Sequence, residues 1–144
     1  MVSVFDVAKY ILQKKGKMST WKLQKLCYYS QAWHMAWTEQ RLIEERFEAW
    51  ANGPVCPELF RVHRAKFMIT AQELPRGSAD KINQDEIESI DIVLNSYGDR
   101  EPYDLRELTH SEAPWKNARA GILEGAPSQN EITVDSMAAY YGSL

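Results

Sequence analysis

The pattern of apolar and polar positions singles out one stretch, Ser19 to Thr38, around which the rest of the chain is arranged. Written as a helix, this stretch is apolar almost all the way round, and its polar residues do not line up as one broad face. A helix of that kind is buried rather than laid on a surface, so we expect it to run through the middle of the fold. The polar residues that interrupt it are Lys22, Gln24, Lys25, Ser30, Gln31 and His34.

The segment before this stretch predicts an amphipathic helix. Ser3 is suited to cap that helix, and Asp6 completes an acidic variant of the capping box. Gly16 follows a basic last turn, at a position where helices commonly end. A short turn then leads to Ser19 or Thr20 as the next N-cap, so the first two helices should pack as a hairpin. The apolar stripe of the first helix is Val4, Val7, Ala8, Ile11 and Leu12.

Residues 41–50 predict a short β-hairpin or extended element, because polar and apolar residues alternate through the second half of the segment. The Asn52-Gly53-Pro54 sequence that follows is expected to break regular structure. Pro57 is a favourable residue for the first turn of a helix, which we expect to continue to Phe67.

The second half of the chain predicts further helices. Asn83 and Glu86 form another capping box, opening a helix that should end at Gly98. The other expected segments are a flexible loop at 74–79, short helices at 103–108 and 114–120, and a closing segment at 132–141 that is helical from Thr133. The expected fold is mainly α: a single compact helical domain, residues 1–144, around a buried central helix, with a short β-hairpin or extended element near residues 41–50.

Composition and charge narrow the class of protein. A chain of 144 residues is long enough for one domain with a sizeable core. Its formal net charge of −3 argues against a nucleic-acid-binding domain, which is usually basic. No signal-peptide pattern and no apolar run long enough to span a bilayer occurs, so we expect a cytoplasmic protein without a membrane partner.

Residues for catalysis or metal binding are few. The histidines and cysteines lack the short spacing of a structural zinc site, so no metal is expected. Cys56 precedes the helix that carries His63, and Ser111 is merely adjacent to His110, so neither pair predicts a nucleophile beside its base. No phosphate-binding glycine loop, dinucleotide fingerprint or paired-carboxylate motif occurs, and no cofactor is expected.

Three blocks of sequence, occurring in order, resemble one known family, the SocA-like antitoxins (Panacea domain, also described as GepA-like phage-associated proteins). The resemblance covers essentially the whole chain, and the three blocks together are quite specific. Cys27 and Cys56 depart from the family pattern, in which an apolar residue is more usual at both positions. The blocks are Leu23-Gln24-Lys25-Leu26 running through Tyr28-Tyr29 to Gln31-Ala32-Trp33-His34; Glu48-Ala49-Trp50 with Gly53-Pro54-Val55 and Pro57; and Leu105, Leu108, Thr109-His110-Ser111 and Pro114-Trp115.

The resemblance implies an antitoxin that binds and neutralises a cognate toxin encoded by an adjacent gene, without catalysis of its own. In one branch of the family the protein acts instead as a proteolytic adaptor that delivers its toxin to a ClpXP-type protease. A third hypothesis, from a different class, is a small hydrolase or nucleotide-handling enzyme that uses Lys25, His34 and His110.

Two groups of motif residues are candidate sites. Burying a polar group unpaired costs a few kcal/mol. The polar group of the central helix should therefore pair with the His110–Ser111 segment or open onto a surface cleft, and we favour a structural polar seam. The second group places an aromatic residue beside a rigid turn. It is either an exposed anchor for the toxin or a structural element, and the sequence leaves both open. The first group is Gln24, Lys25, His34, His110 and Ser111; the second is Trp50, Asn52, Gly53 and Pro54.

Overall fold

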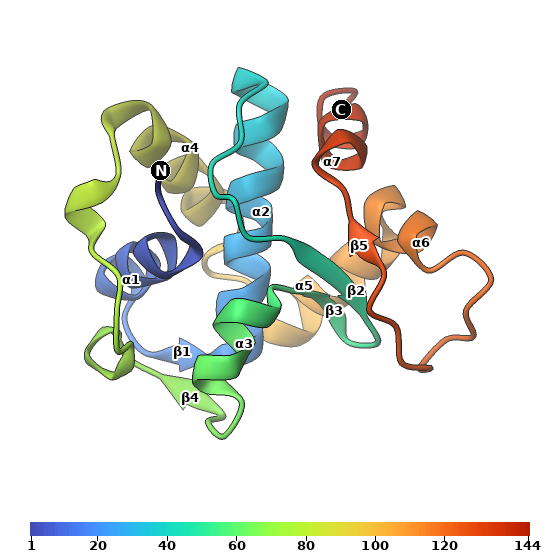
Figure 1. The fold of residues 1–144 in the computed structure, drawn as a ribbon, viewed down its shortest axis with the longest axis horizontal. Helices are drawn as coiled ribbons and strands as arrows, with labels where there is room; N and C mark the ends of the chain where they lie inside the picture. Colours follow the sequence, from blue (N-terminus) through green and yellow to red (C-terminus); the bar gives the residue numbers. More distant parts are fainter.

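The computed structural model describes residues 1–144 and is mainly helical, with seven α-helices and two small antiparallel sheets (Figure 1). The helices are α1 (Val4–Lys15), α2 (Thr20–Thr38), α3 (Pro57–His63), α4 (Gln84–Tyr97), α5 (Pro102–Ser111), α6 (Ala113–Ala118) and α7 (Val134–Tyr141). The strands are β1 (Met18–Ser19), β2 (Phe47–Trp50), β3 (Gly53–Val55), β4 (Met68–Ile69) and β5 (Glu131–Ile132). Short 3-10 turns at Ala71–Glu73 and Ala79–Lys81 lie between β4 and α4.

Helix α2 is the longest element, and most of its residues are buried on all sides of the helix. In Figure 1, α1 and α4 lie on one side of it and α7 on the other. Its N-terminus is capped by Ser19, whose hydroxyl accepts the backbone N–H of Lys22 at 3.1 Å. The two ends differ from the middle, because Trp21 is half-buried and Trp37 is exposed.

The N-terminal helix begins and ends as expected. Ser3 and Asp6 form the reciprocal capping box, and Gly16, with φ of +82°, ends the helix. Asp6 also accepts the backbone N–H of Ser78 at 2.7 Å, and Lys9 donates to the carbonyl of Ala71 at 2.7 Å. The segment expected to be a flexible loop at 74–79 is therefore hydrogen-bonded to α1, a long-range contact that local composition does not reveal.

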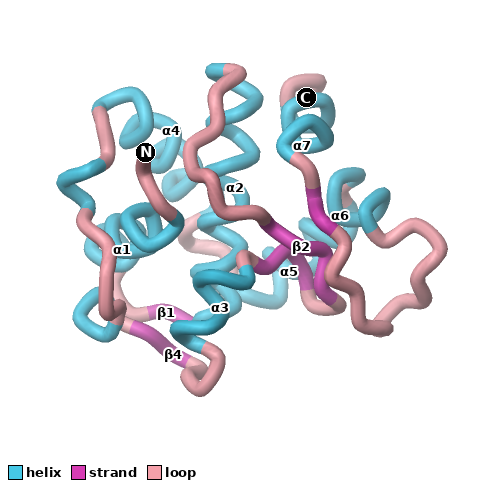
Figure 2. Tube along the Cα trace, viewed as in Figure 1, coloured by secondary structure: helices cyan, strands magenta, loops and turns pink.

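The β-hairpin lies at residues 47–55, later than the 41–50 segment that the sequence predicts. Strands β2 and β3 pair with Trp50 opposite Gly53 and Ala49 opposite Pro54, and β5 pairs with the other side of β2 (Figure 2). The prediction that Gly53-Pro54 breaks regular structure is therefore wrong. Pro54 fits because β3 is an edge strand, where a missing N–H is tolerated.

The first part of that segment is irregular but firmly held. Leu42 and Ile43 are fully buried, and both backbone N–H groups donate to the side-chain oxygen of Gln31, at 2.9 and 3.1 Å. Gln31 therefore satisfies, from within α2, the backbone groups that a strand partner would otherwise satisfy. This is one way in which a polar residue of the apolar helix is used.

The remaining helices follow the sequence with shifted ends. The capping box of Asn83 and Glu86 and the Thr133 cap of the last helix are confirmed. Helix α3 ends at His63 rather than Phe67, and the chain between α5 and α6 shortens to Glu112. None of the helices is both long enough and apolar enough to cross a bilayer.

Candidate functional site

The β2–β3 hairpin is fixed to α2 by the buried side chain of Gln24. Its oxygen accepts the backbone N–H of Cys56 at 2.8 Å, and its nitrogen donates to the Cys56 carbonyl at 3.3 Å. The same amide nitrogen lies 2.9 Å from Nε2 of His63. Gln24 thus replaces a strand partner at the end of β3 and holds the start of α3, which makes it a structural residue.

The tip of the hairpin packs on Lys25. Gly53 has φ of +130°, and a Cβ at this position would lie 3.1 Å from Cε of Lys25 and 3.4 Å from Oγ1 of Thr109. Only glycine combines this backbone conformation with so close an approach. One residue from each of the three motif blocks therefore meets at this point, joining α2, β3 and α5.

The hairpin is held from its other side by α6 and the residue after it. Trp115 donates its indole N–H to the carbonyl of Trp50 at 2.9 Å, and Arg119 donates to the carbonyl of Ala49 at 3.0 Å. His110 stacks on Trp115, with ring centroids 3.8 Å apart. The third motif block therefore supports the backbone of the second through Trp115.

Trp50 is half-buried at the end of β2. Its ring meets Phe60 edge to face at 4.9 Å, and its N–H donates to Glu48 at 2.9 Å. Glu48 is in turn held by Arg46, whose Nη2 lies 2.6 Å from its carboxylate. The rest of the indole faces a surface pocket, so Trp50 combines structural packing with an open face.

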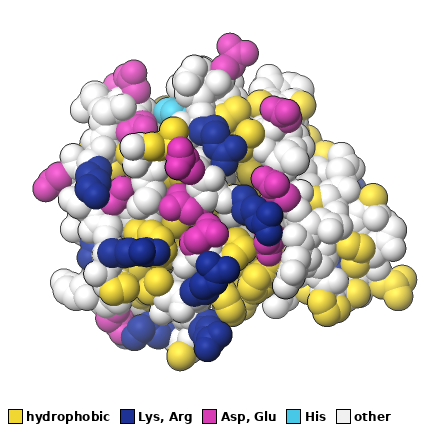
Figure 3. Space-filling model, viewed as in Figure 1, with side chains coloured by type: hydrophobic (Ala, Val, Ile, Leu, Met, Phe, Trp, Pro, Cys, Tyr) yellow, Lys and Arg dark blue, Asp and Glu magenta, His cyan; other side chains and the backbone are white.

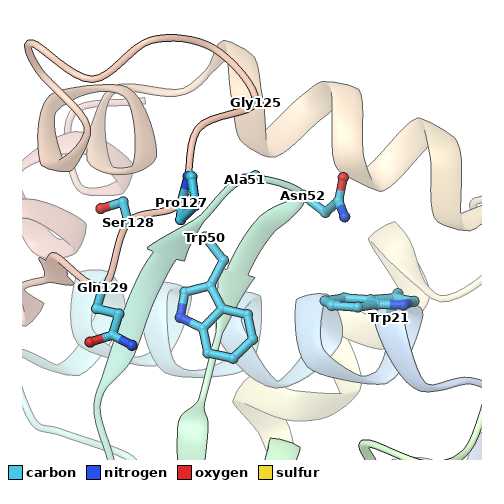
Figure 4. A pocket seen from close by; sticks show the side chains of 8 residues that line it. All are labelled: Trp21, Trp50, Ala51, Asn52, Gly125, Pro127, Ser128 and Gln129. Carbon is cyan, nitrogen blue, oxygen red and sulfur yellow. The ribbon is translucent and has the colours of Figure 1, made fainter.

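That pocket has a volume of about 320 Å³ and lies between α2, the hairpin tip and the loop that precedes β5 (Figure 4). Trp21, Trp50 and Asn52 line it together with Pro127 and neighbouring loop residues, and no charged side chain contributes. Figure 3 shows acidic and basic side chains interleaved over much of one face, whereas none is visible where the loop between α6 and β5 lies.

A second pocket, of about 180 Å³, continues from the first and shares Trp21 and Asn52 with it. Its other side chains include Lys25, Tyr103 and Arg106, so it is basic as well as aromatic. We call the two pockets together the Trp21 groove. It is bordered by α2, the hairpin tip, α5 and the 125–129 loop.

Lys25 gives the groove its unusual electrostatics. The residue is only 2% exposed, and burial together with the nearby Arg106 charge lowers the pKa of its ammonium to about 8. Its Nζ makes one long hydrogen bond, 3.5 Å to the Trp21 carbonyl, and no ion pair. A positive charge is therefore held at the floor of the second pocket without an acidic neighbour.

The structure does not join the expected polar residues into one seam. Gln24 bonds to Cys56 and His63, His34 to the Ser89 hydroxyl at 2.8 Å, and Ser111 is exposed and donates to the Leu108 carbonyl. Of the three α2 residues, Lys25 alone reaches α5, where its Cε and Oγ1 of Thr109 both lie beside Gly53. Gln24 and His34 do not pair with the His110–Ser111 segment, because the α2 side chains point toward different neighbours around the helix. Lys25 opens onto the second pocket, which is the other arrangement that the sequence predicts.

The second predicted group divides as well. Asn52 is exposed and Trp50 is half-buried, and both line the groove. Gly53 and Pro54 are buried strand residues, so they shape the anchor without forming part of its surface.

The residues of the catalytic hypothesis do not converge. Lys25 and His34 are nine positions apart on α2, about 14 Å along the helix axis. His110 is stacked on Trp115, and its Nε2 makes no hydrogen bond to either of them. Burial raises the pKa of the Cys56 thiol to about 12, which keeps it protonated. No three His, Cys, Asp or Glu side chains lie close enough to hold a metal ion.

Sequence reasoning missed several groove residues. Trp21 is an apolar residue of the helix that the sequence predicts to be buried, and its place in the first turn is the only signal that it opens to the surface. Tyr103, Arg106 and the 125–129 loop join the groove through tertiary packing alone.

Comparison with known proteins gives one match. A family model described as "Antitoxin SocA-like, Panacea domain" matches residues 23–116, well over half of the chain, and this segment contains all three motif blocks. Searches of curated proteins and of solved structures give no match. The chain therefore belongs to the SocA-like, Panacea-domain antitoxin family.

Proposed function

We propose that this chain is the antitoxin of a toxin–antitoxin pair and neutralises its cognate toxin, encoded by an adjacent gene, by direct binding in the cytoplasm. It does so without catalysis. The observation that carries the proposal is that the three motif blocks brace the hairpin that borders one aromatic, partly basic groove, and that Lys25 and Trp50 of these blocks line it. Family membership supports the antitoxin role, and the groove supports protein binding as its means.

The composition of the groove suits a protein partner. Trp, Tyr and Arg are the residues that most often dominate binding energy at interfaces, and Trp21, Tyr103 and Arg106 line this surface. The hairpin behind them is fixed by buried hydrogen bonds from Gln24 and Trp115. A surface that is rigid before binding loses little conformational entropy on association, which favours tight binding.

We further propose that the Panacea domain of this chain comprises residues 1–144. Helices α1 and α7 lie outside the matched segment but supply part of the same hydrophobic core. Tyr141 of α7 donates to the buried Glu112 at 2.7 Å, as does Tyr29 of α2. The matched segment alone would lose the Tyr141 hydrogen bond and leave Tyr29 as the one remaining donor to Glu112.

Co-expression with the protein encoded next to this gene tests the proposal. The wild-type chain should restore growth and co-purify with that protein. Trp21→Ala should lose both effects, whereas Trp37→Ala should retain them. Trp37 is a matched control, because it is a tryptophan of the same helix, 45% exposed and about 24 Å from Trp21 along the axis.

The same assay separates direct neutralisation from delivery to a protease. Under direct binding, rescue persists in cells that lack the ClpXP-type protease. Loss of rescue in those cells would establish the adaptor role instead. Absence of both rescue and co-purification, with the correct neighbouring protein present, would refute the antitoxin proposal.

A further inference from the structure

Lys25 is a buried cation that the protein itself does not neutralise. Its ammonium has three N–H donors, of which one makes the 3.5 Å contact with the Trp21 carbonyl. It also lies 5.8 Å from the centre of the Trp21 ring, a weaker form of charge stabilisation. Burying a charge without a partner is costly, and such charges are normally paired. Lys25 is therefore positioned for a partner that comes from outside the chain.

Arg106 adds a second cation to the same pocket. Its guanidinium lies 3.5 Å from the side-chain oxygen of Asn52 and 3.1 Å from the carboxylate of Glu107. Glu107 follows Arg106 directly in the sequence and is largely exposed, so the pair is a surface ion pair of small energy. No acidic side chain lines the pocket, which leaves Lys25 and Arg106 facing it together.

We propose that the pocket lined by Lys25, Asn52 and Arg106 binds the carboxylate of an aspartate or glutamate side chain of the toxin. The adjoining uncharged pocket between Trp21 and Trp50 receives an apolar side chain of the same toxin segment. This inference rests on the proposed function and names the chemistry that the groove recognises.

Charge complementarity selects an acidic group for the pocket lined by Lys25 and Arg106. Two cations without an acidic lining disfavour a basic or neutral occupant, and a carboxylate accepts hydrogen bonds from both an ammonium and a guanidinium. The lowered pKa of Lys25 is consistent with this, since a bound carboxylate would raise it again.

The uncharged pocket between Trp21 and Trp50 selects a protein segment over a free anion. It shares the Trp21 wall with the Lys25 pocket and is lined by uncharged residues only, so a free anion would leave it empty. An extended segment that carries an acidic and an apolar side chain close together fills both pockets at once. Trp21, in both walls, contacts both side chains.

Selection from a displayed library of random nonapeptides on the immobilised full chain tests the inference. Enriched peptides should carry Asp or Glu with an apolar residue close by. Replacing that acid with its amide should weaken binding to the wild type by about tenfold or more, the usual scale of a charge-assisted hydrogen bond. The same replacement should weaken binding clearly less for the Lys25→Met or Arg106→Gln variant, because each keeps only one of the two cations.

Lys116→Met is the matched control, because Lys116 is an exposed cation on α6 that lines neither pocket of the groove. It should bind the enriched peptides as the wild type does. If Lys25→Met fails to fold, Arg106→Gln alone tests the inference. Arg106 is only half-buried, so this variant is expected to fold. Inorganic phosphate should compete only weakly; complete displacement by phosphate would show a general anion site and overturn the inference.

Three further outcomes would also overturn it: no enrichment, enriched peptides that lack an acid, and enriched peptides that bind Lys25→Met as well as the wild type. Growth rescue by the neighbouring toxin separates this failure from failure of the proposed function. If the wild type rescues and a folded Lys25→Met, Arg106→Gln double variant rescues equally, direct neutralisation stands and the carboxylate pocket is wrong. If the wild type does not rescue, the proposed function itself fails.

Discussion

Lys25 shows how one residue can link the stability of this fold to its function. Lys25 lies within a motif on an apolar helix and is buried, yet its ammonium lines a pocket that no acidic side chain of the protein lines. The aliphatic stem of Lys25 supports the hairpin tip at Gly53, while the ammonium lies at the groove. The sequence shows that a polar residue occupies position 25 of the helix. The direction in which its side chain points depends on how β3 and α5 pack against the helix.

Lys25→Met should stabilise the free protein, because it keeps the stem and removes a buried charge. The pKa of Lys25 is lowered from 10.5 to about 8, so between these values the unfolded chain binds more protons than the folded one. The wild type should therefore gain stability as the pH rises from about 8, by about 3 kcal/mol over the whole window.

Urea unfolding at about pH 7.5 and about pH 9.5 checks this expectation, because these two values lie on either side of the lowered pKa of Lys25. The free energy of unfolding of the wild type should rise between the two values relative to that of Lys25→Met. If the unfolding free energies of the two proteins change in parallel with pH, the ammonium of Lys25 is hydrated in the folded state and is not buried away from water.

Glu112 is the second residue whose burial has a measurable consequence. One of its oxygens accepts the hydroxyls of Tyr29 and Tyr141, each at 2.7 Å. Glu112→Ala should destabilise the fold by about 2–5 kcal/mol, because two buried hydroxyls lose their acceptor. Glu112→Gln keeps an acceptor oxygen and should lose much less, as thermal unfolding of the two variants can show. Equal losses would mean that packing and not hydrogen bonding explains the site.

The pH dependence of Glu112 has the opposite sign to that of Lys25. Burial raises the pKa of this carboxyl above its ordinary value, which favours its neutral form in the folded state. Its contribution to stability is complete below the unfolded pKa of 4.5 and is lost as the pH rises through the folded pKa. Glu112→Gln should remove this acid-side slope in a profile of unfolding free energy against pH; an unchanged slope would contradict the assignment.

At the scale of elements, the capping signals placed helix ends well and the packing of α1 on α2 was predictable, whereas the contacts that form the groove were not. The capping boxes at Ser3 and Asn83 and the cap at Thr133 are local hydrogen-bond patterns, so the sequence identified all three. Strand β3 was missed, because Gly53 and Pro54 disfavour a strand unless it lies at an edge. The groove could not be predicted, since its walls come from four segments that meet only in the folded chain.

The hairpin tip offers a test of that tertiary contact. Gly53→Ala should destabilise the fold by about 2 kcal/mol more than Gly121→Ala, as measured by chemical denaturation. Both glycines have positive φ, but a Cβ at Gly53 meets Lys25 and Thr109, whereas one at Gly121 meets nothing within 4 Å. Equal losses would show that backbone strain alone acts at Gly53 and that the tip does not press on Lys25.

At the scale of the whole molecule, the motif blocks build one side of the domain, and the terminal helices complete its core. The segment 23–116, which matches the family, lacks α1 and α7. Tyr28 and Tyr29 would lose Tyr141, with which their rings pack at 6.3 and 6.1 Å.

We expect the isolated segment 23–116 to show no cooperative thermal unfolding, in contrast to residues 1–144. Circular dichroism during heating is sufficient to decide. A cooperative transition near the temperature of the full chain would show that the terminal helices are accessory rather than part of the domain.

The most direct test of toxin binding through the Trp21 groove is calorimetric titration of the purified neighbouring toxin with three proteins. The wild type and Trp37→Ala should bind with equal affinity. Trp21→Ala should bind at least about tenfold more weakly, because truncating a buried interface tryptophan costs about 2 kcal/mol or more. Equal affinity of a folded Trp21→Ala variant would contradict the groove as the binding surface, and absence of wild-type binding would contradict direct neutralisation.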